Sequence, residues 1–251
     1  MDFTPITDWR FYAVAAPAVL LLGVSKSGFG TGFGALAVPL MALSVTVPQA
    51  AAIVMPLLFV MDVLGIRALR KELDRRLFKF LLPFGLLGTV IGALLFKWLD
   101  ARMVTAIVGV FALLAVAQRL LFPPHADSTP PPRWAGAILT TTSGFTSFIA
   151  HAGSPPIIAY VVPMRLAPVV YAATMSYFFF AINLAKWIPY GWLGLLDWRN
   201  MSTSLLLMPL APLGVWLGVR MARRISPVLF YRLVNLGLAL TGLKLVWDGF
   251  F

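Results

Sequence analysis

Two glycine-rich stretches of this sequence place polar side chains inside long apolar regions. The first, Gly23 to Gly34, reads Gly-Val-Ser-Lys-Ser-Gly-Phe-Gly-Thr-Gly-Phe-Gly and contains Lys26. The second, Gly144 to Pro156, begins about 120 residues later and ends in His-Ala-Gly-Ser-Pro-Pro. An ionisable side chain inside a membrane is costly and usually faces a protein interior or a water-filled cavity. We therefore expect a small-anion site between these two stretches.

Helix N-termini suit such a site because they expose unpaired N–H groups and partial positive charge. The sequence predicts that one half-helix begins between Gly32 and Ala35. Ser154 is predicted to cap a second half-helix, with Pro155 at its first position. Two such N-termini pointing at the membrane midplane from opposite halves would surround an anion with dipoles.

The predicted substrate-binding residues are polar side chains or glycines, most of them in these stretches. They are Ser25, Lys26, Ser27, Gly28, Gly30, Thr31, Gly32, His151, Gly153, Ser154 and Asn183. Lys26 would supply the full positive charge, and the hydroxyls would donate hydrogen bonds. The alternative interpretation is that the glycines allow close helix packing and that Lys26 extends to the membrane surface.

Asp62 and His151 are the candidates for proton or ion coupling. Imidazole changes its charge near neutral pH, although a single histidine is as often a packing residue. Asp62 could pair with Lys26 or Arg67 or relay protons, and a plain acid at the membrane surface is the simpler interpretation. Asn183 and Lys186 are polar within a mostly apolar segment, and Asn183 could equally join two helices by a hydrogen bond.

Metal and enzyme chemistry find little support in the composition. The chain has two histidines and no cysteine, which rules out disulfides, thiolate catalysis and cysteine metal sites. No set of nucleophile, base and metal ligands is visible, so we expect neither an enzyme nor a cofactor or metal.

The composition is that of an integral membrane protein. Of 251 residues, 60% are hydrophobic and 12% are charged, and the mean hydropathy is +0.89. Runs without charge, such as Ser27 to Met61, reach the length of about 20 residues that a bilayer requires. Alternating barrel patterning is absent, which predicts an all-α polytopic fold. The net charge of +11 lies mostly in short loops, which indicates positive-inside orientation and not a nucleic-acid partner.

The first apolar run, Phe11 to Val24, would form about 21 Å of helix and the next, Ala35 to Thr46, about 18 Å. Neither spans the hydrocarbon layer of about 30 Å, which predicts a broken or re-entrant element. Further helical segments are predicted at 49–66, 78–98, 101–121, 134–150, 157–163, 168–190, 199–220 and 227–248.

These segments suggest an internal duplication. The expected organisation is a first transmembrane repeat at 1–121, a Pro-rich linker at 122–133 and a second repeat at 134–251. Each repeat has about four helical segments and begins with the broken element. If the broken elements return to the side they came from, each half crosses three times and the halves are inverted; if they cross fully, eight spans result. The basic cluster at 220–224 favours inversion, since eight spans would leave it outside.

Several motifs carry a family resemblance. Gly23 to Gly34, Ala37-Val-Pro39 and the segment Pro48 to Pro56 together resemble the TauE/SafE family of membrane permeases. The second glycine-rich stretch is similar to that family's second motif, except that His151 stands where a smaller residue is expected. The resemblance implies export or uptake of sulfite, sulfoacetate or another organosulfonate across a bacterial inner membrane.

The sequence therefore predicts a multi-pass secondary transporter that moves a small sulfur-containing anion by alternating access, with protons or sodium as the coupling ion. Alternatives are a passive anion channel or a transporter of another small organic anion. The expected partners are the anion and the lipid bilayer. Flat faces rich in Phe, Leu and Gly would also allow a homodimer.

Overall fold

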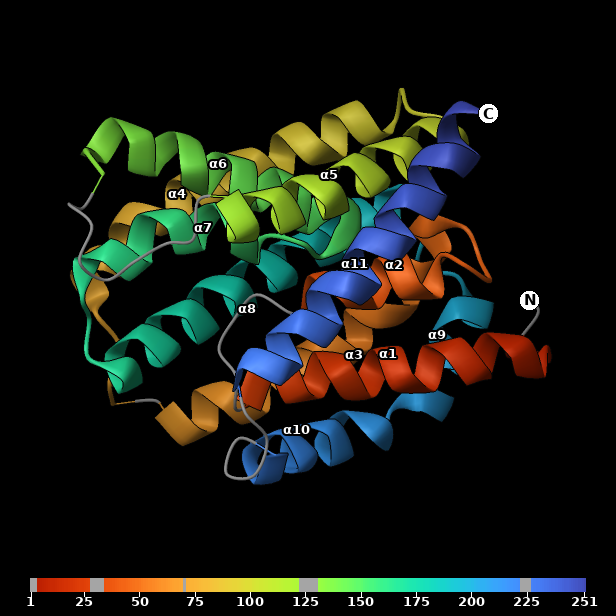
Figure 1. Cartoon of the computed structure of the whole chain (residues 1–251), viewed down its shortest axis with the longest axis horizontal. Helices are drawn as coiled ribbons and strands as arrows, with labels where there is room; N and C mark the ends of the chain where they lie inside the picture. The colour runs from red at the N-terminus through yellow and green to blue at the C-terminus, as the bar shows by residue number, and fades with distance from the viewer. Residues whose placement is uncertain (1–3, 28–33, 70, 122–130, 222–226) are drawn as a thin grey trace.

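The computed structural model describes residues 4–27, 34–69, 71–121 and 131–221, together with 227–251. Within these ranges every regular element is a helix (Figure 1). The elements are α1 (Trp9–Ser27), η1 (Gly34–Leu36), α2 (Ala37–Met41), α3 (Val47–Leu69), α4 (Arg75–Phe96), α5 (Ala101–Leu121), α6 (Arg133–Ala150), α7 (Ser154–Val161), η2 (Val162–Met164), α8 (Pro168–Trp192), α9 (Trp198–Leu207), α10 (Leu210–Met221) and α11 (Pro227–Phe250).

Five of the described helices are long and apolar enough to cross a membrane, namely α3, α4, α5, α8 and α11. The pair α9 and α10, which is bent by 43°, makes a sixth if it is counted as one span. The predicted all-helical polytopic membrane fold is thus confirmed.

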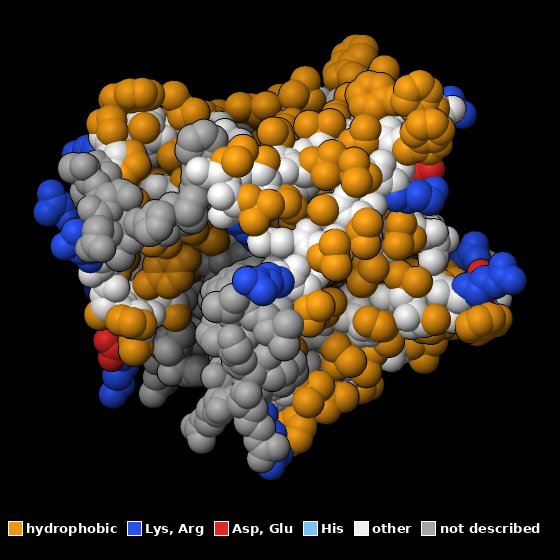
Figure 2. Space-filling model, in the orientation of Figure 1, with side chains coloured by type: hydrophobic (Ala, Val, Ile, Leu, Met, Phe, Trp, Pro, Cys, Tyr) orange, Lys and Arg blue, Asp and Glu red, His pale blue; other side chains and the backbone are white. Residues whose placement is uncertain are grey.

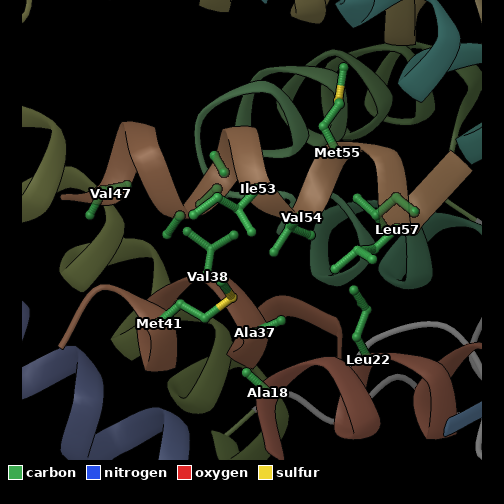
Figure 3. Packing of buried hydrophobic residues seen from close by; sticks show 14 of the residues in the cluster. Ala18, Leu22, Ala37, Val38, Met41, Val47, Ile53, Val54, Met55 and Leu57 are labelled. Carbon is green, nitrogen blue, oxygen red and sulfur yellow. The ribbon is translucent and has the colours of Figure 1, made fainter. Parts of the chain in front are cut away.

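The middle of α3 is the most deeply buried part of the fold. Each side chain from Ala50 to Met55 is at most 1% exposed. Figure 3 shows α2 between α3 and α1, with Val38 and Met41 of α2 among the α3 side chains. A helix that is apolar all round lies either in a protein core or in lipid, and this part of α3 is surrounded by other helices. This burial fixes the position of Asp62, two turns further along α3.

Helices from the two halves of the chain pair with each other. α1 packs along α10 and α6 along α4, while α3 packs on α8 and α5 on α11. Small residues allow the backbones to approach, as is usual between helices in lipid. A Cβ on Gly144 would lie 2.0 Å from the Gly85 carbonyl oxygen, and one on Gly23 would lie 2.8 Å from the backbone of Gly214. This reciprocal pairing is the pattern that two related halves would give, and the repeat boundaries stay a prediction.

Contacts between helix ends define the directions of the helices. The backbone N–H of Asp74, just before α4, donates to Thr174 Oγ1 near the start of α8 at 3.1 Å. Lys97, just after α4, lies 5.4 Å from the ring centroid of Trp192 at the end of α8. Because α3 leads directly into α4, α3 and α8 run in opposite directions (Figure 1). The end of α11 packs on the start of α5, so these two helices are also antiparallel.

Exposed tryptophans and basic residues mark the two ends of the molecule. Of the described tryptophans that are half exposed or more, all but Trp216 of α10 lie at or next to helix termini: Trp9, Trp98, Trp134, Trp192, Trp198 and Trp247. Such residues form aromatic belts at membrane surfaces. Figure 2 shows apolar side chains across the broad face, with several Lys and Arg side chains at the left-hand end, where α4 and α6 begin.

Two predicted segment lengths in the first broken element are wrong. α1 continues to Ser27 and is about 28 Å long, so Ser25 and Lys26 belong to its last turn and do not follow it. The helix predicted from Ala35 to Thr46 ends at Met41. It ends early because the N–H groups of the next residues bond in turns to Leu40 and Met41.

The helix predicted at 199–220 is divided into α9 and α10. The division falls at Met208 and Pro209, where proline lacks an N–H and its ring crowds the preceding turn. The predicted Pro-rich linker lies mostly outside the described residues, and Arg133 at its end is the first residue of α6.

The contact between α4 and α6 generates a stability prediction. A Cβ on Gly88 would lie 1.9 Å from the Thr141 carbonyl oxygen, so Gly88→Ala forces the two backbones apart. We expect this change to lower the free energy of unfolding by about 3 kcal/mol, measured by thermal unfolding in detergent.

Gly191→Ala in α8 is the matched control, because its nearest neighbour would be Leu196 Cδ1 at 3.9 Å. Alanine has a higher helix propensity than glycine, so this variant should be at least as stable as the parent protein, by up to about 1 kcal/mol. Equal melting of the two variants would contradict the packing account.

Candidate functional site

A small cavity lies where α1, α3 and α8 meet the break between α6 and α7. Its polar lining comes from Ser25, Lys26, Ser147, His151, Ser154 and Asn183. All but Ser147 were predicted from the sequence. The volume of about 30 Å³ holds one or two water molecules, too little for an oxyanion of four or more heavy atoms. Among the described residues, the structure therefore brings five of the predicted side chains together around a small cavity.

An ion pair joins α1 to α3 at this cavity. Lys26 Nζ donates to Asp62 Oδ1, and the two side chains are 20% and 1% exposed. A carboxylate this deeply buried is stable only with a charged or hydrogen-bonding partner. Lys26 also lies in the last turn of α1, where the helix dipole favours a cation. Of the two partners that the sequence offered for Asp62, the structure selects Lys26.

Asn183 connects this ion pair to a second lysine. Its Nδ2 donates to Asp62 Oδ2 at 2.6 Å, and its Oδ1 accepts from Lys186 Nζ at 2.9 Å. The amide is oriented by its neighbours, because only its NH₂ can face the carboxylate and only its oxygen can face the ammonium. Asn183 and Lys186 are three residues apart and so share one face of α8.

Lys186 is completely buried and has several hydrogen-bond acceptors around it. Its Nζ lies 2.7 Å from Ser147 O, 2.8 Å from Ser147 Oγ and 3.1 Å from His151 Nδ1. The sequence prediction noted that Lys186 is polar but assigned neither Lys186 nor Ser147 to the site. The signal available was a lysine one turn after Asn183 in an apolar segment, which marks a functional position in a membrane protein.

His151 adopts a backbone conformation that normally belongs to glycine. It is the C-cap of α6 with φ 52°, in the left-handed region. This explains why a smaller residue was expected at this position. Because Lys186 donates to Nδ1, Nε2 carries the ring hydrogen and donates to the Ala51 carbonyl oxygen at 2.9 Å. The imidazole thus ties the break between α6 and α7 to the middle of α3.

The start of α7 differs from its prediction. Ser154 is the first helical residue and not the N-cap, and Gly153 in the cap position makes no side-chain cap bond. Pro155 and Pro156 follow and have no N–H, so this helix start offers few donors to an anion. The Gly153 carbonyl oxygen accepts a hydrogen bond from Ser143 Oγ at 2.5 Å, and a Cβ added at Gly153 would lie 2.7 Å from the Ser143 carbonyl oxygen. Gly153 therefore shapes the break.

The helix start after the first glycine-rich stretch is also a weaker anion-binding N-terminus than predicted. α2 has five residues, and the N–H of Gly34 before it donates to Ser25 Oγ at 3.0 Å. Ser27 ends α1. The other predicted ligands of this stretch lie outside the described residues: Gly28, Gly30, Thr31 and Gly32. The positive character of the described site therefore rests on lysines more than on helix N-termini.

The site has more basic than acidic side chains. It holds two lysines, Lys26 and Lys186, against one carboxylate, Asp62, so with both lysines protonated it carries one positive charge in excess. Within the described part of the chain no three His, Asp or Glu residues come together as a metal site would require. The arrangement is thus suited to a small anion.

Broken helices around a polar site within a multi-pass bundle are a feature of many membrane transporters. A family model described as "Sulfite exporter TauE/SafE" matches residues 15–245 of the chain. The chain therefore belongs to the TauE/SafE family and is a membrane transporter. Searches of curated proteins and of solved structures gave no significant match.

The left-handed conformation of His151 yields a prediction. His151→Gly and His151→Ala both remove the imidazole, but only glycine adopts this φ without steric cost. We expect the glycine variant to be more stable than the alanine variant by about 1 kcal/mol in thermal unfolding. An alanine variant at least as stable as the glycine variant would show that the backbone at this break is not held in the left-handed region.

Proposed function

We propose that this protein moves a small sulfur-containing anion, such as sulfite or an organosulfonate, by alternating access around the cavity at Lys26. The single observation that carries the proposal is the gathering of two lysines against one carboxylate at a small cavity in a TauE/SafE family member. A net charge buried in a membrane protein is costly, and an anionic substrate would neutralise it.

The contacts of Lys26 support a mode of binding. Its ammonium faces the cavity and already holds one oxyanion, the carboxylate of Asp62. An incoming sulfonate or sulfite presents the same kind of oxygen and would share or replace that contact. The hydroxyls of Ser25, Ser147 and Ser154 line the same space, and a sulfur oxyanion needs several donors because its charge is spread over its oxygens.

Helix directions support the alternating-access part of the proposal. α8 runs opposite to α3 and α11 runs opposite to α5, as expected of inverted halves (Figure 1). Each broken element packs on a helix of the other half, α1 on α10 and α6 on α4. A rocking motion of one half would therefore open the cavity to one side at a time. In an inner membrane, the positive-inside rule would direct the basic loop before α4 to the cytoplasm.

Binding tests this proposal most simply. Sulfite or sulfoacetate should raise the melting temperature of the purified protein, because a ligand at one hundred times its Kd adds about 2.7 kcal/mol. Lys26→Gln should abolish the shift. Lys79→Gln removes an exposed lysine from α4 and should keep it.

Lys26→Gln leaves Asp62 without its counter-charge, so the double variant Lys26→Gln/Asp62→Asn is measured alongside to restore neutrality. An unchanged shift in either Lys26 variant would refute the assigned site. A shift with lactate but with no sulfur anion would refute the substrate class.

A further inference from the structure

Lys186 occupies a site built like one for a bound cation. Its ammonium is surrounded by Ser147 O and Oγ, Asn183 Oδ1 and His151 Nδ1, at 2.7 to 3.1 Å. The side chain is 0% exposed and does not line the cavity. Its three N–H groups face four acceptors, so the cage holds the lysine best when it is protonated. A group that holds a positive charge behind the substrate cavity is placed to couple that charge to the substrate.

We propose that Lys186 is the proton carrier of this transporter and that its protonation and anion binding at Lys26 favour each other. This inference rests on the proposed function and names the coupling ion, which is the proton, and the residue that carries it. Lysine suits the role because its buried amine is used by proteins in both the protonated and the neutral form.

His151 provides the route between Lys186 and the cavity, because its ring contacts both. In the transfer an N–H bond of the Lys186 ammonium breaks and a new N–H bond forms at His151 Nδ1. The positive charge moves to the imidazole ring, which still donates from Nε2 to Ala51 O. When the site opens, the ring turns its Nδ1 away from Lys186 toward the cavity, the Nδ1–H bond breaks and the proton passes to water, which restores the neutral ring.

Asp62 supplies the coupling between the two sites. Its carboxylate is shared between Lys26 on Oδ1 and, through Asn183 on Oδ2, Lys186. When an anion takes over Lys26, the negative charge of Asp62 loses its counter-charge, which favours a proton on Lys186. The reverse holds by linkage, so a protonated Lys186 strengthens anion binding. Proton and anion therefore travel together.

Several other titratable groups lie near Lys186, and each is already engaged in a contact or lies away from it. The titratable groups around it are His151 from the break after α6, Asp62 from α3, Lys26 from α1 and Tyr190 on α8 itself. Tyr190 donates its hydroxyl hydrogen to the Phe148 carbonyl oxygen at 2.7 Å, and its ring centroid lies 6.1 Å from that of His151. α4 also packs on α8, but Arg75, Arg76 and Lys79 lie in its exposed first turns.

Proton uptake on anion binding tests the proposal. Methanesulfonate is the probe, because it keeps one negative charge at every pH used and any proton taken up belongs to the protein. The wild-type protein in weakly buffered detergent solution should take up a fraction of a proton, at most about one, for each anion bound. Its affinity should fall about tenfold as the pH rises through the range in which Lys186 loses its proton.

Two variants of Lys186 and one control complete the test. Lys186→Met should bind without proton uptake and without pH dependence. Lys186→Arg keeps a permanent charge and should also bind without uptake. Lys244→Met removes an exposed lysine of α11, paired with Asp248, and should behave like the wild type. No uptake in the wild type, or undiminished uptake in Lys186→Met, overturns the proposal whatever the stability of the variants.

The failure of this inference is distinguishable from failure of the proposed function. If no sulfur anion binds the wild-type protein, the proposed function fails, and a titration without ligand then decides the role of Lys186. Titrated from acid to alkaline pH, the folded wild type should release one more proton than Lys186→Met. If the wild type and Lys186→Met released equal numbers of protons, Lys186 would not be the proton carrier.

Discussion

The buried carboxylate of Asp62 is the constraint on which the rest of the site depends. A charge at 1% exposure in a membrane protein needs strong partners, and Asp62 finds them in Lys26 on α1 and Asn183 on α8. Through Asn183 the chain of contacts reaches Lys186 and His151, and through His151 it returns to α3 at Ala51. One carboxylate thus joins both broken elements to the most buried helix of the fold.

Close backbone packing makes this polar network possible. Glycines at the contacts of α1 with α10 and of α6 with α4 bring the two halves of the chain together without apolar side chains between them. The same closeness leaves only about 30 Å³ of space beside Lys26. On the proposed mechanism, movement of one half against the other admits the substrate, which links helix packing to alternating access.

The sequence was informative where the physical signal was local. Hydropathy located the spans, and the cost of a charge in lipid pointed to Lys26, His151 and Asn183 before any contact was known. It failed where the outcome depended on tertiary partners. The importance of Lys186 depends on Ser147, which lies on α6 and is 39 residues earlier in the sequence. The end of α2 at Met41 depends on turn hydrogen bonds. The role of Ser154 was misjudged by one position, because Gly153 takes the cap.

Solute exchange in proteoliposomes tests the central claim, that the site carries a sulfur anion by alternating access. Labelled sulfite is added outside vesicles that contain the purified protein, with or without unlabelled sulfite inside. The account predicts uptake that saturates with concentration and is accelerated by unlabelled sulfite on the far side. Flux that rises in proportion to concentration and ignores the inner anion would contradict it and identify a passive channel.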